Sequence, residues 1–337
     1  MGALHFNRQQ IKKELQGNER FVIWRRDFVA AYRKSYETGQ LKRKLEEALN
    51  RLHACEICPR TCKANRSENK TGICGIGRFA RVASAFPHFG EEDCLRGWKG
   101  SGTIFFGGCN LRCVFCQNFD ISQLEPGRQM TASELAEVML ALQDAGCHNI
   151  NLVTPTHVMP QILEALLLAA QRGLSLPLVY NTGAYDSLET IQLLDGVVDI
   201  YMPDFKLWDV SRSAKYLTAS DYPQKAQTAI KAMHAQVGVL KTDEDGLALR
   251  GLLVRHLVMP GLLDDTRTIM RWLATELSPD TYVNLMSQYQ PAHRVKTEQS
   301  FSEIRRRITI QEWELAIEAA LQAGLWRLDS RRITIPF

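Results

Sequence analysis

The sequence lacks any uninterrupted apolar run of the roughly 20 residues that a membrane-spanning helix requires. Its start, MGALHFNRQQ, lacks the apolar stretch of a secretory signal. Gly2 could carry a myristoyl group, but Phe6 stands where that motif requires Ser or Thr. These absences argue against a membrane partner and a lipid anchor, and we expect a cytoplasmic protein.

A strong excess of one charge is also absent. The 41 Lys and Arg residues nearly balance the 37 Asp and Glu residues, which leaves a formal charge of +4. This excess is too small to indicate a nucleic-acid partner. Hydrophobic residues make up 45% of the chain and charged residues 23%, which is typical of a globular protein and not of a disordered one.

Complete disulfide pairing is impossible because the chain has nine cysteines, an odd number. Disulfides are in any case rare in a reducing compartment. We therefore expect most of the cysteines to bind a metal or a cluster. Cys147, at the end of a predicted helix, is expected to be a buried core residue instead.

Composition divides the chain into four expected parts: a helical extension (1–53), a Cys-rich metal-binding segment (54–100), a barrel (101–295) and a helical segment that packs on the barrel (296–337). Residues 8–53 carry apolar side chains at helical spacing, which predicts two charged amphipathic helices. The Cys-rich segment has little periodicity. We expect metal, rather than a hydrophobic core, to organise it.

Beyond Gly100, short β-rich runs alternate with helical stretches. The expected strands are Thr103–Phe106, Ile150–Val153, Leu178–Asn181, Asp199–Met202, Leu252–Val258 and Tyr282–Met286. The expected helices are Thr131–Ala145, opened by a capping box of Thr131 and Glu134, then Met159–Arg172, Leu188–Leu194, Asp264–Leu277 and Gln311–Ala323. Six such units predict an α/β fold with a parallel sheet, in the form of a partial (βα)6 TIM-like barrel. Chemistry is then expected at the C-terminal ends of the strands.

The segment GTIFFGGCNLRCVFCQN places Cys109, Cys113 and Cys116 in a C-x3-C-x2-C arrangement directly after the first expected strand. Thiolates are the usual protein ligands of iron–sulfur clusters, and three of them leave one iron of a cubane open. Gly107 and Gly108 allow a tight turn at the strand end. The pattern predicts a [4Fe-4S] cluster at the mouth of the barrel.

Two alternatives to a cluster are weaker. A structural zinc ion requires four protein ligands, and this compact loop offers only three, so that a fourth would have to come from a distant segment. Unrelated buried cysteines have no packing reason to gather three within eight residues of one loop.

The C-x3-C-x2-C loop, with aromatic Phe115 before its last cysteine, resembles the hallmark of radical S-adenosylmethionine (SAM) enzymes, and the resemblance covers roughly residues 100–295. It implies a [4Fe-4S] cluster whose open iron binds SAM. It also implies reductive cleavage of SAM to a 5′-deoxyadenosyl radical, which removes hydrogen from a substrate. An electron donor such as flavodoxin or ferredoxin is implied as a partner.

Within that superfamily, the chain resembles the group related to pyruvate formate-lyase activating enzyme, which implies a glycyl-radical enzyme as a protein substrate. At the end of the second expected strand, activases carry Gly-Gly-Glu. This sequence departs from that pattern, because it has Asn151-Leu-Val-Thr-Pro-Thr-His157 there. His256 should face away from its neighbour Arg255. The cofactor-binding residues that the resemblance implies are Thr154, Thr156, Asn181, Asp204, Lys206, Arg255 and His293.

A second set of four cysteines precedes the first motif, with the spacing C-x2-C-x3-C-x11-C. Four thiolates need no external ligand, which suits either a second [4Fe-4S] cluster or a structural zinc ion. Spacing alone does not decide between them, and we favour iron–sulfur because of the neighbouring cluster. The four residues are Cys55, Cys58, Cys62 and Cys74.

The loop Pro87-His-Phe-Gly-Glu-Glu-Asp-Cys94 has no decisive pattern. Its residues could line a substrate entrance, donate to a metal or lie in solvent, and we predict that Glu91 and Glu92 are solvated. Cys94 could be a substitute ligand or could relay a radical, although nothing in the spacing demands it. The role of His88 stays open.

Three functions are compatible with these patterns. The first is an activase that abstracts hydrogen from a glycine of a partner enzyme. The second is radical modification of another peptide, RNA, lipid or metabolite, with the upstream cysteines conducting electrons. The third is a non-catalytic metal-binding module, which the intact loop at a strand end disfavours.

Overall fold

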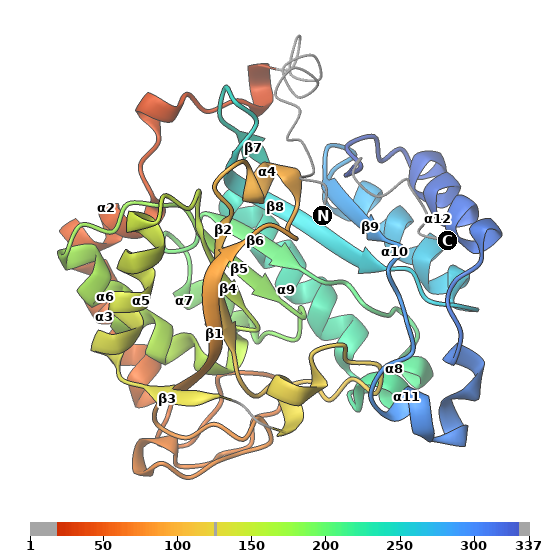
Figure 1. Ribbon diagram of the computed structural model, residues 1–337, viewed down its shortest axis with the longest axis horizontal. Coiled ribbons are helices and arrows are strands. Elements are labelled where there is room, and N and C mark those ends of the chain that lie inside the picture. Colours follow the sequence, from red (N-terminus) through yellow and green to blue (C-terminus); the bar gives the residue numbers. More distant parts are fainter. Residues whose placement is uncertain (1–18, 125–126, 330–337) are drawn as a thin grey trace.

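Six parallel strands form the centre of the molecule. The computed structural model describes residues 19–124 and 127–329. Neighbouring strands pair in parallel in the order β2-β4-β5-β6-β8-β9, and the sheet does not close (Figure 1). The partial (βα)6 barrel predicted from the sequence is thereby confirmed. These strands are β2 (Ser101–Phe106), β4 (Ile150–Val153), β5 (Leu178–Thr182), β6 (Ile200–Pro203), β8 (Ala248–Leu257) and β9 (Tyr282–Met286).

Three further strands extend this sheet in antiparallel fashion. β1 (Ala80–His88) pairs with β2, and β3 (Arg128–Met130) pairs with β1. β7 (Lys241–Thr242) pairs with β8. The sequence predicted no strand between Cys55 and Gly100, and that expectation is wrong for β1, which belongs to the sheet of the barrel.

Helices cover the outer face of the sheet. The capping box predicted at the start of α5 is present, since the Thr131 side chain accepts from the Glu134 amide and the Glu134 carboxylate accepts from the Thr131 amide. All five predicted helices of the barrel region are confirmed within two residues. They are α5 (Ala132–Asp144), α6 (Met159–Gln171), α7 (Leu188–Leu193), α10 (Leu263–Glu276) and α12 (Ile310–Gln322). Four others were not predicted: α4 (Asp93–Arg96), α8 (Val210–Leu217), α9 (Tyr222–Val237) and α11 (Arg294–Thr297).

The two faces of the sheet are buried by different partners. Strand residues such as Leu152, Tyr180 and Tyr201 join the large core formed with the helices. The alternate residues face inward, where Val179 and Ile200 pack with Cys94, Leu95 and neighbouring apolar side chains in a second, smaller core. Successive strand residues point to opposite faces, so Val179 and Ile200 lie on the inner face. Since they pack with Cys94 and Leu95, α4 covers that face near the amino ends of the strands.

The N-terminal extension is only partly as predicted. α3 (Gln40–Asn50) buries Leu41 and Leu45 and confirms the second predicted helix, and α2 (Ala31–Glu37) precedes it. Between residues 19 and 30 the first predicted helix is replaced by two short 3-10 turns, because the Ile23 amide donates to the Thr242 carbonyl beside β7. The apolar positions at Ile11 and Leu15 lie outside the described residues.

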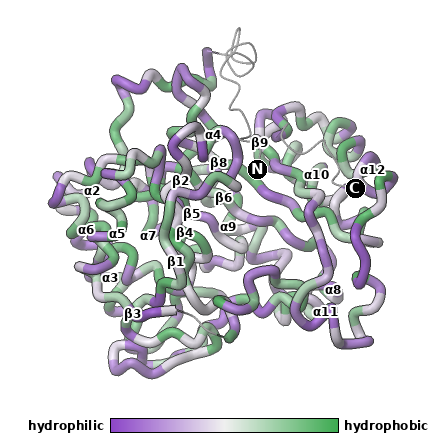
Figure 2. The backbone as a smooth tube through the Cα atoms, viewed as in Figure 1, coloured by the Kyte–Doolittle hydropathy of each residue, from purple (hydrophilic) through white to green (hydrophobic). Residues whose placement is uncertain are grey.

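No helix of the described residues is long and apolar enough to cross a bilayer. Apolar and polar residues alternate along the chain, as the hydropathy colouring shows (Figure 2). The expectation that the chain is cytoplasmic stays a prediction.

Candidate active site

The loop after β2 brings three cysteine thiols together at the C-terminal end of the barrel. Cys113 is buried, and Cys109 and Cys116 are half-buried. Burial raises the pKa of Cys113 to about 12, an effect that the Lys206 ammonium opposes and the neighbouring Cys116 thiol reinforces. Burial, with Cys113 and Cys116 beside it, likewise raises the pKa of Cys109. Thiols this close and this desolvated are neutral at pH 7 unless a metal takes the proton's place.

An ion pair lies beside this loop. Lys206 Nζ donates to Asp204 Oδ2 at 2.7 Å, just beyond the end of β6. Burial acts to lower the pKa of Lys206, but the neighbouring Asp204 carboxylate outweighs it and raises that pKa, so that Lys206 is protonated. The second carboxylate oxygen of Asp204 is buried and has no hydrogen-bond partner among the described residues. The pair therefore presents both a cation and a spare acceptor next to the cysteine loop.

Arg255 is held by two carboxylates that the sequence placed in solvent. Its guanidinium donates to Glu92 from Nε at 2.8 Å and from Nη2 at 2.6 Å, and it also pairs with Glu91. Glu91 and Glu92 are 5% and 0% exposed, so the prediction that they are solvated is wrong. They are buried because β1 and α4 fold against the inner face of the barrel, which the sequence pattern did not reveal.

The charge network continues across three adjacent strands. Asp204 at the end of β6, Arg255 on β8 and Asn284 on β9 occupy paired positions and therefore lie in one row. Asn284 Nδ2 donates to Glu92 Oε1 at 2.5 Å, while Asn284 Oδ1 is buried without a partner among the described residues. A continuous polar row thus leads from the cysteine loop to Glu92 inside the barrel.

The Arg255 guanidinium of this row favours the ionised form of Glu91. Burial acts to raise the pKa of Glu91, but the Arg255 charge and a hydrogen bond from His88 outweigh it and hold that pKa below its usual value. His88 Nδ1 lies 3.0 Å from Glu91 Oε1. The His88 ring also meets Phe86 and Phe105 edge-on, with centroids 5.5 and 5.9 Å apart. This half-exposed aromatic group borders the inner face.

The residues predicted at the ends of β4 and β5 differ in availability. Thr154 is half-buried and adopts a left-handed backbone (φ 60°) that is uncommon for threonine. The Thr156 hydroxyl lies 3.0 Å from that of Thr182, in a buried network with Tyr180 and Asp186. Asn181 is buried at the end of β5. The Thr156 hydroxyl is thus part of a buried hydrogen-bond network. Thr154 lies at the end of the strand, outside that network.

The segment that follows β9 packs against the cysteine loop. The His293 ring stacks on Phe119, which follows the loop, with centroids 4.9 Å apart and the rings 8° from parallel. The Val295 amide donates to the Val114 carbonyl at 3.3 Å. His256 faces away from Arg255, as predicted, with its ring nitrogens against the Phe205 carbonyl and the Thr266 hydroxyl. Of the two histidines, only His293 adjoins the loop.

The upstream cysteines form a second group directly behind this loop. Cys55, Cys58 and Cys74 are buried, and Cys62 is half-buried. Burial raises the pKa of Cys58 to about 12, and the nearby Cys74 and Cys55 thiols add to that rise. Cys74 has Cys55 and Cys62 as neighbours in turn. Each of the four predicted residues therefore has another of them as an electrostatic neighbour, while Cys147 is a buried core residue as predicted.

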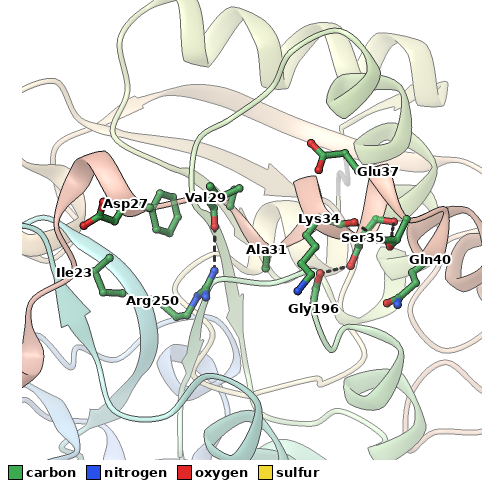
Figure 3. A pocket seen from close by; sticks show the side chains of 13 residues that line it. Ile23, Asp27, Val29, Ala31, Lys34, Ser35, Glu37, Gln40, Gly196 and Arg250 are labelled. Carbon is green, nitrogen blue, oxygen red and sulfur yellow. Dashed lines mark hydrogen bonds between the residues drawn. The ribbon is translucent and has the colours of Figure 1, made fainter.

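The described residues also line an open cavity of about 800 Å³ far from these cysteines (Figure 3). It lies beside α2, between Lys34 and Arg250, with Gly196 at its edge. Gly196 and Arg250 precede or begin strands at the amino ends of the barrel. This cavity is therefore at the opposite end of the strands from the C-x3-C-x2-C loop.

Comparison with known proteins identifies the family. The sequence model of the radical SAM superfamily matches residues 103–239, which include the cysteine loop and the ends of β4 to β6. An uncharacterised protein of Methanocaldococcus jannaschii is 34% identical over 292 residues, which is 84% of this chain and 78% of the relative. The chain belongs to the radical SAM superfamily. A second uncharacterised protein of that organism is 26% identical over 142 residues, 38% of this chain and 42% of its own length.

Two solved structures show a more distant likeness. SuiB of Streptococcus suis, solved with its precursor peptide SuiA, has 12% identity and a TM-score of 0.44 over 64% of this chain and 43% of its own. Methylornithine synthase (PylB) has 14% identity and a TM-score of 0.40 over 64% of this chain and 60% of its own. This chain therefore spans less than half of SuiB.

Radical SAM proteins use a [4Fe-4S] cluster and SAM, and the donors at the loop fit that cluster. A cubane takes one thiolate on each iron, so three thiols leave one iron for SAM. In the part of the chain that the structure describes, no three His, Cys, Asp or Glu side chains converge as they would around a single metal ion. The loop offers thiols only, the ligand type that iron–sulfur clusters require.

Proposed function

We propose that this chain is an enzyme that cleaves SAM reductively and uses the resulting radical to remove hydrogen from a substrate. Cys109, Cys113 and Cys116 are the proposed cluster ligands. A cluster held by them would supply the one electron that reductive cleavage of SAM to methionine and a 5′-deoxyadenosyl radical requires. The observation that carries the proposal is the grouping of three thiols at the C-terminal end of β2 in a radical SAM chain.

The chain's own residues bind and orient the cofactor in this proposal. Lys206 is positively charged beside Cys113 and can pair with the SAM carboxylate, while the spare oxygen of Asp204 can accept a hydrogen bond from the ribose or the amino group. Thr154 at the end of β4 is the proposed acceptor for the amino group in place of a carboxylate. His293, stacked on Phe119, offers a flat surface for adenine.

SAM cleavage is the direct test. Anaerobically reconstituted protein should hold about four irons on the loop and should form 5′-deoxyadenosine with dithionite and SAM. Cys113→Ala should lower that yield about a thousandfold or more, because the cluster loses a ligand. Cys147→Ala is the matched control and should leave the yield unchanged. Cluster-loaded protein that never cleaves SAM would refute the proposal.

The proposed substrate is a backbone glycine of a partner enzyme, in keeping with the resemblance to activating enzymes. Glycine hydrogen abstraction would leave a stored radical on the partner. Affinity capture under anaerobic conditions, followed by electron paramagnetic resonance (EPR) of the captured protein, tests this step. A glycyl-radical enzyme that gains an organic radical signal supports it. Its absence from cells that encode this chain argues for another substrate.

A second substrate class is favoured by the acids inside the barrel. Glu91, Glu92 and Asp204 outnumber the cations Arg255 and Lys206, and Asn284 adds a buried acceptor without a partner among the described residues. Such a surface suits a polar substrate that donates hydrogen bonds, such as a peptide or an amine-bearing metabolite. If Glu91→Gln abolishes coupling of SAM cleavage to substrate but keeps cleavage itself, this class gains support over a glycine backbone.

A further inference from the structure

We propose that Cys55, Cys58, Cys62 and Cys74 hold a second [4Fe-4S] cluster, which passes electrons to the cluster at the Cys109 loop. This inference rests on the proposed function, because it names the route by which the electron for SAM cleavage arrives. The four thiols belong to residues 51–79. The regular element of this segment is a short 3-10 helix, η3 (Arg66–Glu68).

The backbone of this segment is folded around the thiols. Cys55 exchanges hydrogen bonds with the opposite arm of the loop, through its amide to Ala64 and its carbonyl to Lys63, at 3.0 Å each. Thr61 and Lys63 adopt left-handed conformations (φ 39° and 57°), which cost energy for residues other than glycine. A Cβ at Gly72 would lie 2.3 Å from Cys62 Sγ. The chain is thus bent tightly at the places that bring the sulfurs together.

A buried arginine indicates that the group bound here is an anion. Arg66 is 0% exposed, and its Nε donates to the Gly77 carbonyl at 3.1 Å. Its hydrogen-bond partners among the described residues include no carboxylate. Its Nη1 donates to the His157 carbonyl at 2.7 Å and lies 3.7 Å from Cys55 Sγ, while its Nη2 has no partner within the described ranges. An isolated buried charge is very costly. Four thiolates on a cubane carry net negative charge and would balance Arg66.

The two thiol groups touch through the residues of the C-x3-C-x2-C loop. The Asn110 side chain hydrogen-bonds the Cys58 thiol, and the Asn110 carbonyl accepts from Arg60 Nε at 2.8 Å. Gly108 has φ 76°, and a Cβ there would lie 2.5 Å from the Cys74 carbonyl oxygen. Both segments lie on the lower edge of Figure 1, in orange and yellow. Direct contact of this kind suits electron transfer between two clusters. A zinc ion could not take part in such a transfer, because Zn²⁺ has no redox chemistry.

The upstream segment also has the charge to receive an electron carrier. Residues 51–79 contain six Lys and Arg residues and two Asp and Glu residues, so this short segment carries as large a positive excess, +4, as the whole chain. The side chains of Lys63 and Lys70 are 61% and 68% exposed, and each pairs with an acid of the same segment, Glu56 and Glu68 respectively. A positive surface speeds encounter with an acidic partner. The proposed donor is therefore an acidic one-electron carrier that docks here.

The electron balance of the proposed relay is simple. The carrier is oxidised by one electron and the upstream cluster is reduced by one. That electron then moves to the cluster of the Cys109 loop and from there to the SAM sulfonium, whose sulfur–carbon bond breaks. Both clusters return to their oxidised states, and no proton is transferred.

Metal content and EPR test the site itself. Full-length protein reconstituted anaerobically should hold about eight irons, and both the Cys109/Cys113/Cys116→Ala variant and the Cys58/Cys62→Ser variant should hold about four. Cys147→Ala is the control and should hold about eight. The reduced protein should give an EPR spectrum broader than the sum of the spectra of the two variants. Zinc without iron in the first variant, or a spectrum equal to that sum, would overturn the proposal.

Reduction by two donors tests the relay. With reduced flavodoxin, Cys58/Cys62→Ser should reduce its remaining cluster much more slowly than the wild type, whereas dithionite should reduce both at similar rates. Lys63→Glu/Lys70→Glu leaves every thiol in place and should slow only the flavodoxin reaction. Equal flavodoxin rates in all three proteins would exclude the relay. Eight irons without SAM cleavage would refute the proposed function alone, and cleavage with four irons would refute the second cluster alone.

Discussion

The barrel and the segment of residues 51–79 are buried by different means. In the barrel, six parallel strands alternate apolar side chains between two cores, so that backbone pairing and hydrophobic burial coincide. The upstream segment has one short 3-10 helix in its cysteine-bearing stretch, four thiols, a fully buried Arg66 and only three fully buried aliphatic side chains, Leu52, Ile57 and Ile76, which join the large core. Such a segment cannot repay its loss of conformational entropy by apolar burial alone. The barrel should therefore fold without metal, whereas the segment should depend on it.

Arg66→Met should produce the largest loss of stability and should confine it to the upstream segment. The substitution keeps the apolar stem but leaves a buried anionic centre without its counter-charge, at a cost of about 3–5 kcal/mol. Hydrogen exchange of residues 51–79 and iron content measure the loss. Lys70→Met, at an exposed position of the same segment, is the control. Unchanged protection in Arg66→Met would mean that no anion lies there.

Leu152→Ala should destabilise the barrel and spare the metal centres. Leu152 is fully buried in the middle of the sheet, and truncating such a leucine costs about 2–5 kcal/mol. Chemical denaturation followed by circular dichroism measures this change. Iron content in native buffer should equal that of the wild type. If the upstream iron were lost first, the two regions would not be independent.

Glu91→Gln should weaken the charge network and alter the response to acid. The folded pKa of Glu91 is held below its usual value, so its ionised form stabilises the protein above the unfolded pKa, and that stability is lost as pH falls through the lowered folded pKa. Removing the charge-assisted bond to Arg255 should cost about 1.5–3 kcal/mol at pH 7. Stability measured from pH 7 to pH 3 should fall less steeply in the variant. A parallel fall would show that Glu91 does not titrate there.

Thr131→Ala should have the smallest effect of the four. It removes the capping box of α5, which typically costs about 1 kcal/mol. The loss should appear in the melting temperature of the barrel, with both iron sites intact. Ser133→Ala, two residues further on in the first turn of the same helix, provides a control that leaves the cap in place. A loss as large as that of Leu152→Ala would contradict the comparison.

Local patterns explain what the sequence predicted well. The six parallel strands follow from short β-rich runs, and the thiol loop from a spacing of eight residues. α9 was missed because its buried face mixes larger residues such as Ile230 and Met233 with Ala226 and Ala229, which give little contrast with the polar side. A weakly amphipathic pattern of this kind does not distinguish a packed helix from a loop.

The acids of the site were beyond local pattern. Glu91 pairs with Arg255, which lies 164 positions away in the sequence, and no motif in the residues around Glu91 indicates that contact. Only the folding of β1 and α4 onto the inner face of the barrel joins them. By contrast, Asp204 and Lys206 are two residues apart and were recognised together from the resemblance to a family strand. Contacts between distant segments are therefore where the predicted site was incomplete.

The placement of α4 closes the barrel at one end and leaves the other end open. Cys94 and Leu95 pack against the inward side chains near the amino ends of the strands and stop that end. Substrate and product can then enter and leave the barrel only at the end that bears the cysteine loop. A product that leaves by the rim through which its precursor entered must clear it before the next molecule arrives. Release and entry should consequently be ordered events, visible as product inhibition competitive with substrate.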